Sequence, residues 1–187
     1  LLAEYATQKR VFVPISVIPK KVINAFISAE DKDFYNHFGI DLMATLRALI
    51  TNVKNIGTNK RLIGASTITQ QVAKNFLLSS EMSYERKIKE AILAIRIERA
   101  FTKNEILELY LNEIYLGFKS YGVAAAALNY FDKSLDNLDL SEAAFLAALP
   151  KAPNNYNPIY KKKQAMIRRN WVSVSYTHLT LPTSRSV

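Results

Sequence analysis

Apolar residues recur every three or four positions along most of the chain, which predicts a protein built from helices. The first such stretch, 20–29, follows Pro19, and proline is favoured at the start of a helix. The same period returns, with polar breaks between, over 41–53, 66–78, 83–101, 103–115, 122–131, 141–149 and 161–171. Because no segment is convincing as part of a sheet, the predicted fold class is mostly α.

Local sequence signals mark where several of these helices begin and end. Thr102 and Glu105 have the spacing of a capping box, in which a side-chain oxygen at each position accepts a free backbone N–H. Glu142 stands near the start of the apolar helix 141–149 and is expected to help cap it. Residues 10–18 contain two prolines and alternate weakly, which predicts an extended entry segment.

The helical period is lost from Ser173 onward. We therefore expect residues 1–172 to form one domain and residues 173–187 to be a linker or a non-native tail. His178 lies in that tail and receives no functional role. Since the chain opens in mid-pattern at Leu1, we expect a fragment whose N-terminal anchor is missing.

Composition limits the class of protein. The 187 residues are 49% hydrophobic and 22% charged, values typical of a globular domain. The absence of cysteine excludes disulfides and thiolate metal sites. Lysine and arginine total 25 against 16 acidic residues, a formal charge of +9 that suits nucleic acid, an anionic membrane or a phosphorylated substrate. No apolar run approaches the roughly 18 residues of a membrane-spanning helix.

An acidic cluster interrupts this basic chain within residues 29–39, which hold three carboxylates and one of the two histidines. Glu30 and Asp31 follow the apolar helix 20–29, where the helix dipole disfavours negative charge. Residues that break a local rule are candidates for function. The alternative is a solvated acidic loop that Phe34 and Phe38 anchor in the core.

A second polar segment begins the helix 66–78. Hydroxyl and amide side chains lie along its first turns, and the free N–H groups of a helix start favour anions. Gln71, Lys74 and Asn75 are three to four residues apart and so share a helix face. The alternative is a well-capped helix with a polar exposed side.

A cationic cluster follows on the next helix. Arg86 and Lys87 precede Glu90 by four and three residues, so the three side chains project from one face. The alternative is an ordinary surface pair, worth about a few tenths of a kcal/mol.

Five segments in one order resemble the glycosyltransferase family 51 domain, which is found in class A penicillin-binding proteins and in monofunctional transglycosylases. The resemblance covers residues 10–172 and implies a lysozyme-like helical fold with a membrane-contacting lobe over 41–61. The matching motifs are Glu-Asp-x-x-Phe-x-x-His-x-Gly at 30–39, Gly-x-Ser-Thr-Ile-Thr-Gln-Gln at 64–71, Arg-Lys-x-x-Glu at 86–90, Ile-Leu-Glu-x-Tyr-Leu-Asn at 106–112 and Leu-Pro-Lys-Ala-Pro at 149–153.

The resemblance implies a reaction. Members of this family polymerise lipid II into glycan strands at the outer face of the cytoplasmic membrane. Glu30 matches the general base that deprotonates the acceptor's 4-hydroxyl, which attacks C1 of the donor. Undecaprenyl diphosphate then leaves, and the anomeric carbon inverts. Glu90 matches the second essential carboxylate.

The resemblance also implies partners. Asp31 matches a contact to the diphosphate or to a divalent cation, Mg²⁺ or Mn²⁺. The partners expected are lipid II with the growing glycan strand, the membrane surface and a C-terminal transpeptidase domain in the full-length protein. The substrate-binding residues carried over, in addition to Asp31, are Ser66, Gln71, Lys74, Asn75, Arg86 and Lys87.

One position departs from the family pattern. Many members carry arginine four residues before the Arg86–Lys87 pair, where this chain has Met82. That arginine helps to grip the diphosphate, so Met82 bears on donor affinity rather than on reaction class.

Two other functions are compatible with parts of the sequence. A lysozyme-like muramidase or lytic transglycosylase would share the fold and a catalytic glutamate, but it has no diphosphate to bind and needs no array of cations. A helical module for nucleic acid would suit the positive charge. No recognition helix stands out, however, and the acidic cluster would repel phosphates, so nucleic acid is not an expected partner.

Overall fold

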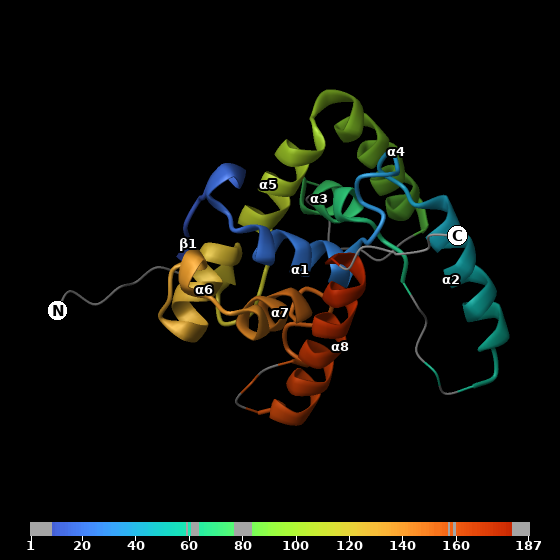
Figure 1. The fold of residues 1–187 in the computed structure, drawn as a ribbon. Helices are drawn as coiled ribbons and strands as arrows, with labels where there is room; N and C mark the ends of the chain where they lie inside the picture. The colour runs from blue at the N-terminus through green and yellow to red at the C-terminus, as the bar shows by residue number, and fades with distance from the viewer. Residues whose placement is uncertain are drawn as a thin grey trace, which may run out of the picture. The chain divides into compact units, whose positions relative to one another are not determined.

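The computed structural model describes residues 9–58, 60, 64–76, 84–156, 158 and 160–180 (Figure 1). The chain forms two compact units. We call residues 1–32 with 108–187 the terminal unit and residues 33–107 the central unit, and each is described by itself. Helices dominate both units, so the predicted mostly α fold is confirmed.

Three mutually packed helices form the core of the terminal unit. They are α1 (Lys20–Glu30), α7 (Leu140–Ala148) and α8 (Lys162–Thr180), and Figure 1 shows α8 in red beside the orange α7. Fully buried side chains fill the space between the elements, among them Val22, Phe26 and Leu146. The unit also contains α6 (Val123–Phe131), the C-terminal part of α5 (Lys103–Glu113) and two short 3-10 helices, Ile15–Val17 and Leu135–Asn137.

The entry segment is held against α5 by two residues of the fourth motif. Asn112 accepts the Val13 N–H at 2.8 Å and donates to the Val13 carbonyl at 2.9 Å. Glu108 accepts the Ile15 N–H at 2.6 Å. The segment begins with β1 (Lys9–Arg10), which pairs in parallel with β2 (Ser120–Tyr121). The extended conformation predicted for residues 10–18 is thus wrong over Ile15–Val17, which forms a 3-10 helix, and polar side chains of α5 hold the segment on both sides of its start.

The central unit contains α2 (Leu42–Lys54), α3 (Ile68–Phe76), α4 (Tyr84–Ala100) and the start of α5. α3 packs against α4. Asp41 caps α2 by accepting the Ala44 N–H at 2.8 Å. The apolar face predicted for this helix is exposed rather than buried, and only Ala48 of α2 is buried. The exposed members are Leu42, Met43, Leu46, Leu49, Ile50 and Val53.

Within the described residues, no helix combines the length and the apolar character that crossing a membrane requires. α8 has the length, but its sequence is basic in the first turns and rich in hydroxyl side chains near its end.

The predicted end of the last helix at residue 171 is wrong, because α8 continues to Thr180. Ala165, Val172 and Ser175 are buried on one face of α8, at helical spacing. Because Ser175 is polar, the buried position that it occupies does not show in a pattern of hydrophobic residues. Ser173 and Thr177 turn their hydroxyls back to α8 carbonyls, which satisfies these groups locally.

The other helices begin and end within about two residues of the predicted positions, and one capping residue differs from the prediction. Thr102 and Glu105 form the predicted capping box at the start of α5. At the start of α7 the cap is Asp139, which exchanges hydrogen bonds with Glu142. Glu142 therefore has its expected role, with a partner that lies before the predicted helix start.

Gly39, which ends the acidic motif, provides a test of the packing in the central unit. Its φ is +87°, and a Cβ there would lie 2.8 Å from the Ala94 carbonyl oxygen. The Thr67 hydroxyl also donates to the Gly39 carbonyl at 2.6 Å. We expect Gly39→Ala to lower the free energy of unfolding by about 2–4 kcal/mol, since backbone strain and overlap add. Denaturant titration followed by circular dichroism measures this.

The matched control is Gly57→Ala. Gly57 also has a positive φ, +82°, but a Cβ there meets no atom within 4 Å. Its cost should therefore be about 1 kcal/mol, from the backbone conformation alone. Equal losses in the two variants would show that the contact with Ala94 is unimportant.

Candidate functional site

Glu30 and Asp31 lie at the C-terminal end of α1. Glu30 is the last helical residue, and its side chain is only 12% exposed. Asp31 is the C-cap; it leaves the helix with φ −159° and is buried. Two carboxylates thus occupy the end of a helix where exposed carbonyls already concentrate negative charge. Such an arrangement requires a compensating cation.

Arg168 of α8 is that cation in the terminal unit. Its Nη2 lies 3.7 Å from Glu30 Oε1 and 3.5 Å from the carbonyl oxygen of Ala29. Burial lowers the pKa of Arg168, and the neighbouring Glu30 carboxylate and Tyr156 oppose this shift. Arg168 was not among the predicted site residues, because the helix 161–171 carries several basic residues and nothing near Arg168 in the sequence marks its partner. Its position between the inward-facing Ala165 and Val172 was the available signal.

Two further groups of the terminal unit lie near Glu30. Tyr110 is fully buried, and burial raises its pKa well above the usual range, with Glu30 and Asp31 adding to the effect. It therefore remains a neutral phenol at physiological pH. Burial and the proximity of Arg168 lower the pKa of Lys151, whereas Glu30 raises it. Tyr110 and Lys151 come from the fourth and fifth motifs, so three motifs converge on this carboxylate.

In the central unit, four predicted residues form one polar network around Glu90. Glu90 is 1% exposed, and its Oε1 accepts from Lys87 Nζ at 2.5 Å. Lys87 Nζ also donates to Ser66 Oγ at 2.8 Å, and Arg86 Nη1 lies 3.9 Å from Glu90 Oε2. Burial excludes the interpretation of Glu90 as part of an ordinary surface pair. The network holds two cations beside a hydroxyl at the start of α3.

The start of α3 is less open to anions than the sequence suggests. Thr67 N–H donates to Gln70 Oε1 at 3.0 Å, and Gln70 N–H donates to Thr67 Oγ1 at 3.1 Å. Two backbone donors of a helix-start anion site are therefore already bonded within a capping box. Anion binding here depends instead on side chains. Lys74 and Asn75 are exposed further along α3, and Gln71 is half-buried.

The acidic loop after Asp31 is held in the central unit by Lys103. Its Nζ donates to the His37 carbonyl at 2.6 Å, forms an ion pair with Glu98 at 2.7 Å and lies 4.5 Å from the centre of the Phe34 ring. Phe34 is fully buried, whereas Phe38 is 83% exposed. The alternative interpretation, a solvated acidic loop that both rings anchor in the core, therefore fails for Phe38.

The predicted site residues divide between the two units. Glu30 and Asp31 belong to the terminal unit, and the central unit brings Ser66, Arg86, Lys87 and Glu90 together. Gln71, Lys74 and Asn75 share α3 in the central unit. Met82 lies outside the described residues. Among the described residues, no three histidine or acidic side chains gather as a ready-made metal site.

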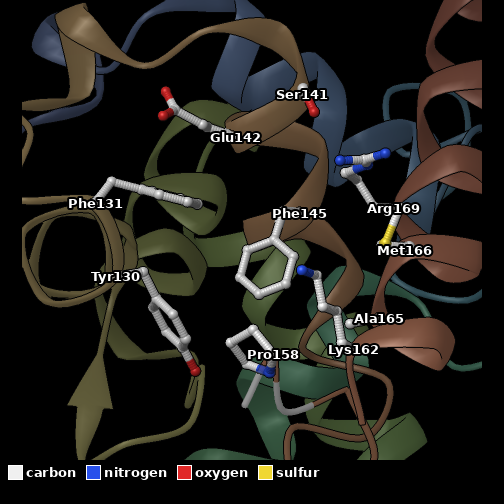
Figure 2. Close-up of a pocket in the computed structure, with 10 residues that line it drawn as sticks. All are labelled: Tyr130, Phe131, Ser141, Glu142, Phe145, Pro158, Lys162, Ala165, Met166 and Arg169. Atoms are coloured by element: carbon white, nitrogen blue, oxygen red, sulfur yellow. The ribbon is translucent and has the colours of Figure 1, made fainter.

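A cavity of about 260 Å³ in the terminal unit holds none of these residues. Figure 2 shows Phe145 of α7 between the α6 ring of Tyr130 and the α8 side chains of Met166 and Arg169. The Tyr130 hydroxyl is directed elsewhere, to the Leu116 carbonyl at 2.7 Å. The cavity is therefore a mainly apolar hollow between α6, α7 and α8, distinct from the predicted site residues.

Comparison with known proteins finds relatives over nearly the whole chain. The profile of the family described as Transglycosylase matches residues 1–176. Penicillin-binding protein 1A of Rickettsia typhi is 56% identical over 172 residues, which make up 92% of this chain and 22% of that protein. Penicillin-binding protein 1A of Aquifex aeolicus is 56% identical over 165 residues, 88% of this chain and 22% of that protein.

The fold resembles a solved structure as well. The 2.6 Å crystal structure of penicillin-binding protein 1A from Haemophilus influenzae superimposes with a TM-score of 0.51 at 31% identity. The superposition covers 94% of this chain and 16% of that one. The chain thus spans about a fifth of the length of the curated relatives that it matches.

The network around Glu90 leads to a prediction about the stability of the protein. Lys87→Met should lower the free energy of unfolding by about 1–2 kcal/mol, because it removes the closest cation of a buried carboxylate. Lys89→Met is the matched control, since Lys89 pairs with Glu85 at 2.7 Å on the exposed side of the same helix. Because that pair is exposed to solvent, Lys89→Met should leave the free energy of unfolding close to the wild-type value. Urea unfolding measures the free energy of unfolding of both variants. Equal values would contradict the role given to Lys87.

Proposed function

Because the chain belongs to the transglycosylase family, we propose that it polymerises lipid II into peptidoglycan glycan strands, with Glu30 as the general base. The chain's activity class is peptidoglycan glycosyl transfer. A lysozyme-like muramidase or lytic transglycosylase is not favoured, since the family match and the relatives both indicate synthesis of the cell wall.

The observation that carries the proposal is the environment of the Glu30 carboxylate. It is largely buried at the end of α1, and a guanidinium nitrogen lies 3.7 Å from its Oε1. A cation at that distance stabilises the ionised form of a carboxylate. It is also beyond the range of a good hydrogen bond, so it stabilises the charge without a strong directional bond to that oxygen. A general base needs to be ionised before the reaction and able to accept a proton during it.

The proposed step is an inverting substitution. Glu30 takes the proton of the acceptor's 4-hydroxyl while that oxygen forms a bond to C1 of the donor sugar. The bond from C1 to the diphosphate oxygen breaks, and undecaprenyl diphosphate leaves with the electron pair. Attack from the face opposite the leaving group inverts the anomeric carbon. The sugar hydroxyl takes the place that water has in hydrolysis.

The central unit supplies the groups that we assign to the donor. Lys74, Arg86 and Lys87 would stabilise the negative charge that grows on the leaving diphosphate. Glu90 holds Lys87 in place through its 2.5 Å ion pair, and Lys87 in turn contacts Ser66. A buried carboxylate fixed between two cations is suited to orienting them, which is the role we assign to Glu90. Gln71 and Asn75 are assigned to the donor's sugars.

Asp31 provides only part of the ligands that a divalent cation needs. Asp31 stands beside Glu30, and no third acidic or histidine ligand joins them among the described residues. Mg²⁺ and Mn²⁺ in phosphate-binding sites often take one or two carboxylates and complete their shell with substrate oxygens and water. We therefore propose that Asp31 would hold such a cation together with the diphosphate. The bound cation would neutralise part of the leaving group's charge.

We further propose that α2 contacts the outer face of the cytoplasmic membrane. Its exposed apolar side chains and the chain's charge of +9 are the features that support this, since anionic lipids attract basic surfaces. The relatives' length and their name, penicillin-binding protein, support a further proposal. In the longer protein this domain would act beside a transpeptidase domain.

The direct test is Glu30→Gln. An amide cannot accept the proton, so the rate of lipid II polymerisation should fall by at least about a hundredfold, while lipid II binding and the circular dichroism spectrum stay near those of the wild type. Gel analysis of products from labelled lipid II measures polymerisation. Glu90→Gln should also be strongly impaired.

Asp33→Asn is the matched control, because Asp33 is an acidic residue of the same motif with no assigned chemistry. It should polymerise lipid II at close to the wild-type rate. Polymerisation by Glu30→Gln would rule out the general-base assignment. A wild-type protein that digests finished peptidoglycan but does not polymerise lipid II would establish the muramidase instead.

A further inference from the structure

The cavity between α6, α7 and α8 has an aromatic wall. Phe145 of α7 packs edge-on against two rings of α6, with centroid distances of 5.5 Å to Tyr130 and 5.8 Å to Phe131. All three rings line the cavity, and none of them is fully buried. The cluster therefore leaves apolar surface open, and covering that surface with an apolar group of a partner would be favourable.

The side of the cavity formed by α8 carries positive charge. Figure 2 shows Lys162, Met166 and Arg169 of α8 on the side away from the α6 rings. Lys162 is exposed and Arg169 is half-buried. Nη2 and Nε of Arg169 donate to the side-chain oxygen of Asn170 at 2.7 and 3.1 Å. An amide oxygen has no net charge, so these hydrogen bonds do not neutralise the guanidinium.

The acidic side chain in the lining, Glu142, is already engaged with other groups. Its Oε1 accepts from Lys133 Nζ at 2.7 Å, and its Oε2 accepts the Asp139 N–H at 2.8 Å in the capping box of α7. Lys133 therefore balances the charge of Glu142. Lys162 and Arg169 give the lining an excess of positive charge, which favours an occupant with negative groups.

The volume of the cavity limits what it can hold. It is about 260 Å³, which is below the range of about 300–1,000 Å³ typical of sites that enclose a whole small molecule. Such a space suits one aromatic or branched apolar group. Protein interfaces commonly place an apolar anchor in a pocket and polar or charged groups around it. An aromatic side chain flanked by carboxylates would match both sides of this cavity.

We propose that the cavity is a docking site for an acidic segment of a partner protein. One aromatic side chain of that segment enters between α6, α7 and α8, and its neighbouring carboxylates pair with Lys162 and Arg169. Burial of the aromatic ring supplies most of the affinity, and the ion pairs select acidic over basic segments. None of the lining residues is assigned to the reaction, so this inference goes beyond the proposed function and does not depend on it.

The methionine side chains provide a readout that needs no enzymatic activity. Met166 lines the cavity, whereas Met43 lies on α2. The probe is the peptide acetyl-Asp-Glu-Phe-Glu-Asp-amide, added to protein with ¹³C-labelled methionine methyl groups. A ring that enters the cavity should shift the NMR signal of the Met166 methyl in a saturable manner and leave that of Met43 unchanged. The signal that disappears in Met166→Leu identifies Met166.

Two altered peptides separate the contributions of the ring and the charges. One has alanine in place of phenylalanine, and the other has lysine in place of all four acidic residues. Each should bind at least about tenfold more weakly, because the first lacks the apolar anchor and the second repels the cations of α8. Equal binding of the acidic and basic peptides would contradict the role given to the positive charge.

The protein variant that tests the cations is the double substitution Lys162→Gln with Arg169→Gln. It should bind the acidic peptide about tenfold more weakly and with less dependence on salt, because two exposed charge contacts are lost. The matched control is Lys161→Gln with Lys163→Gln. It removes the same net charge from neighbouring positions that do not line the cavity, so its affinity should stay within about twofold of the wild type.

Several results would overturn the proposal. They are an unchanged Met166 signal at millimolar concentrations of the acidic peptide, and equal loss of affinity in the two double variants. Tight binding of free N-acetylphenylalanine, equal to that of the peptide, would assign the cavity to a small aromatic acid. A Met166 shift with phosphatidylglycerol vesicles would assign it to a membrane, and a shift on concentrating the protein alone would assign it to a second copy of this chain.

Discussion

A negative charge at the wrong end of a helix is the constraint on which the terminal unit depends. Glu30 ends α1, where the helix carbonyls already make a carboxylate unfavourable. The unit compensates with Arg168 from α8, which reaches both the carboxylate and the carbonyl of Ala29. The packing of α8 on α1 and α7 therefore has an electrostatic role, because it delivers the guanidinium to the end of α1.

The central unit meets the same difficulty in a different way. Glu90 is buried within a helix rather than at its end, and both of its cations come from the preceding turn of α4. Local sequence spacing is enough to build this network, whereas the terminal unit needs residues more than a hundred positions apart. The two carboxylates of the predicted site thus differ in how much tertiary structure they require.

That difference explains what the sequence could predict. Helix positions, the Thr102 cap and the Arg86–Lys87–Glu90 cluster follow from periods of three and four residues, and the structure confirms them. Arg168 could not be found in this way, because its partner is distant in sequence. The helical course of 173–180 was missed because Ser175 occupies an inward position that hydrophobicity does not mark. The alternative that placed Phe38 in the core failed for this residue, because an apolar side chain in a loop does not by itself show whether it will be buried.

The exposed face of α2 has a consequence for how the protein behaves in a test tube. Leu42 is 73% exposed and Leu49 is 60% exposed, with four more large apolar side chains on the same helix. A surface of this kind favours self-association in water, and the repulsion between chains of charge +9 opposes it. Salt screens that repulsion but does not weaken the apolar attraction. The colloidal stability of the isolated domain is therefore set by ionic strength, and a mild detergent that covers this apolar face should improve it.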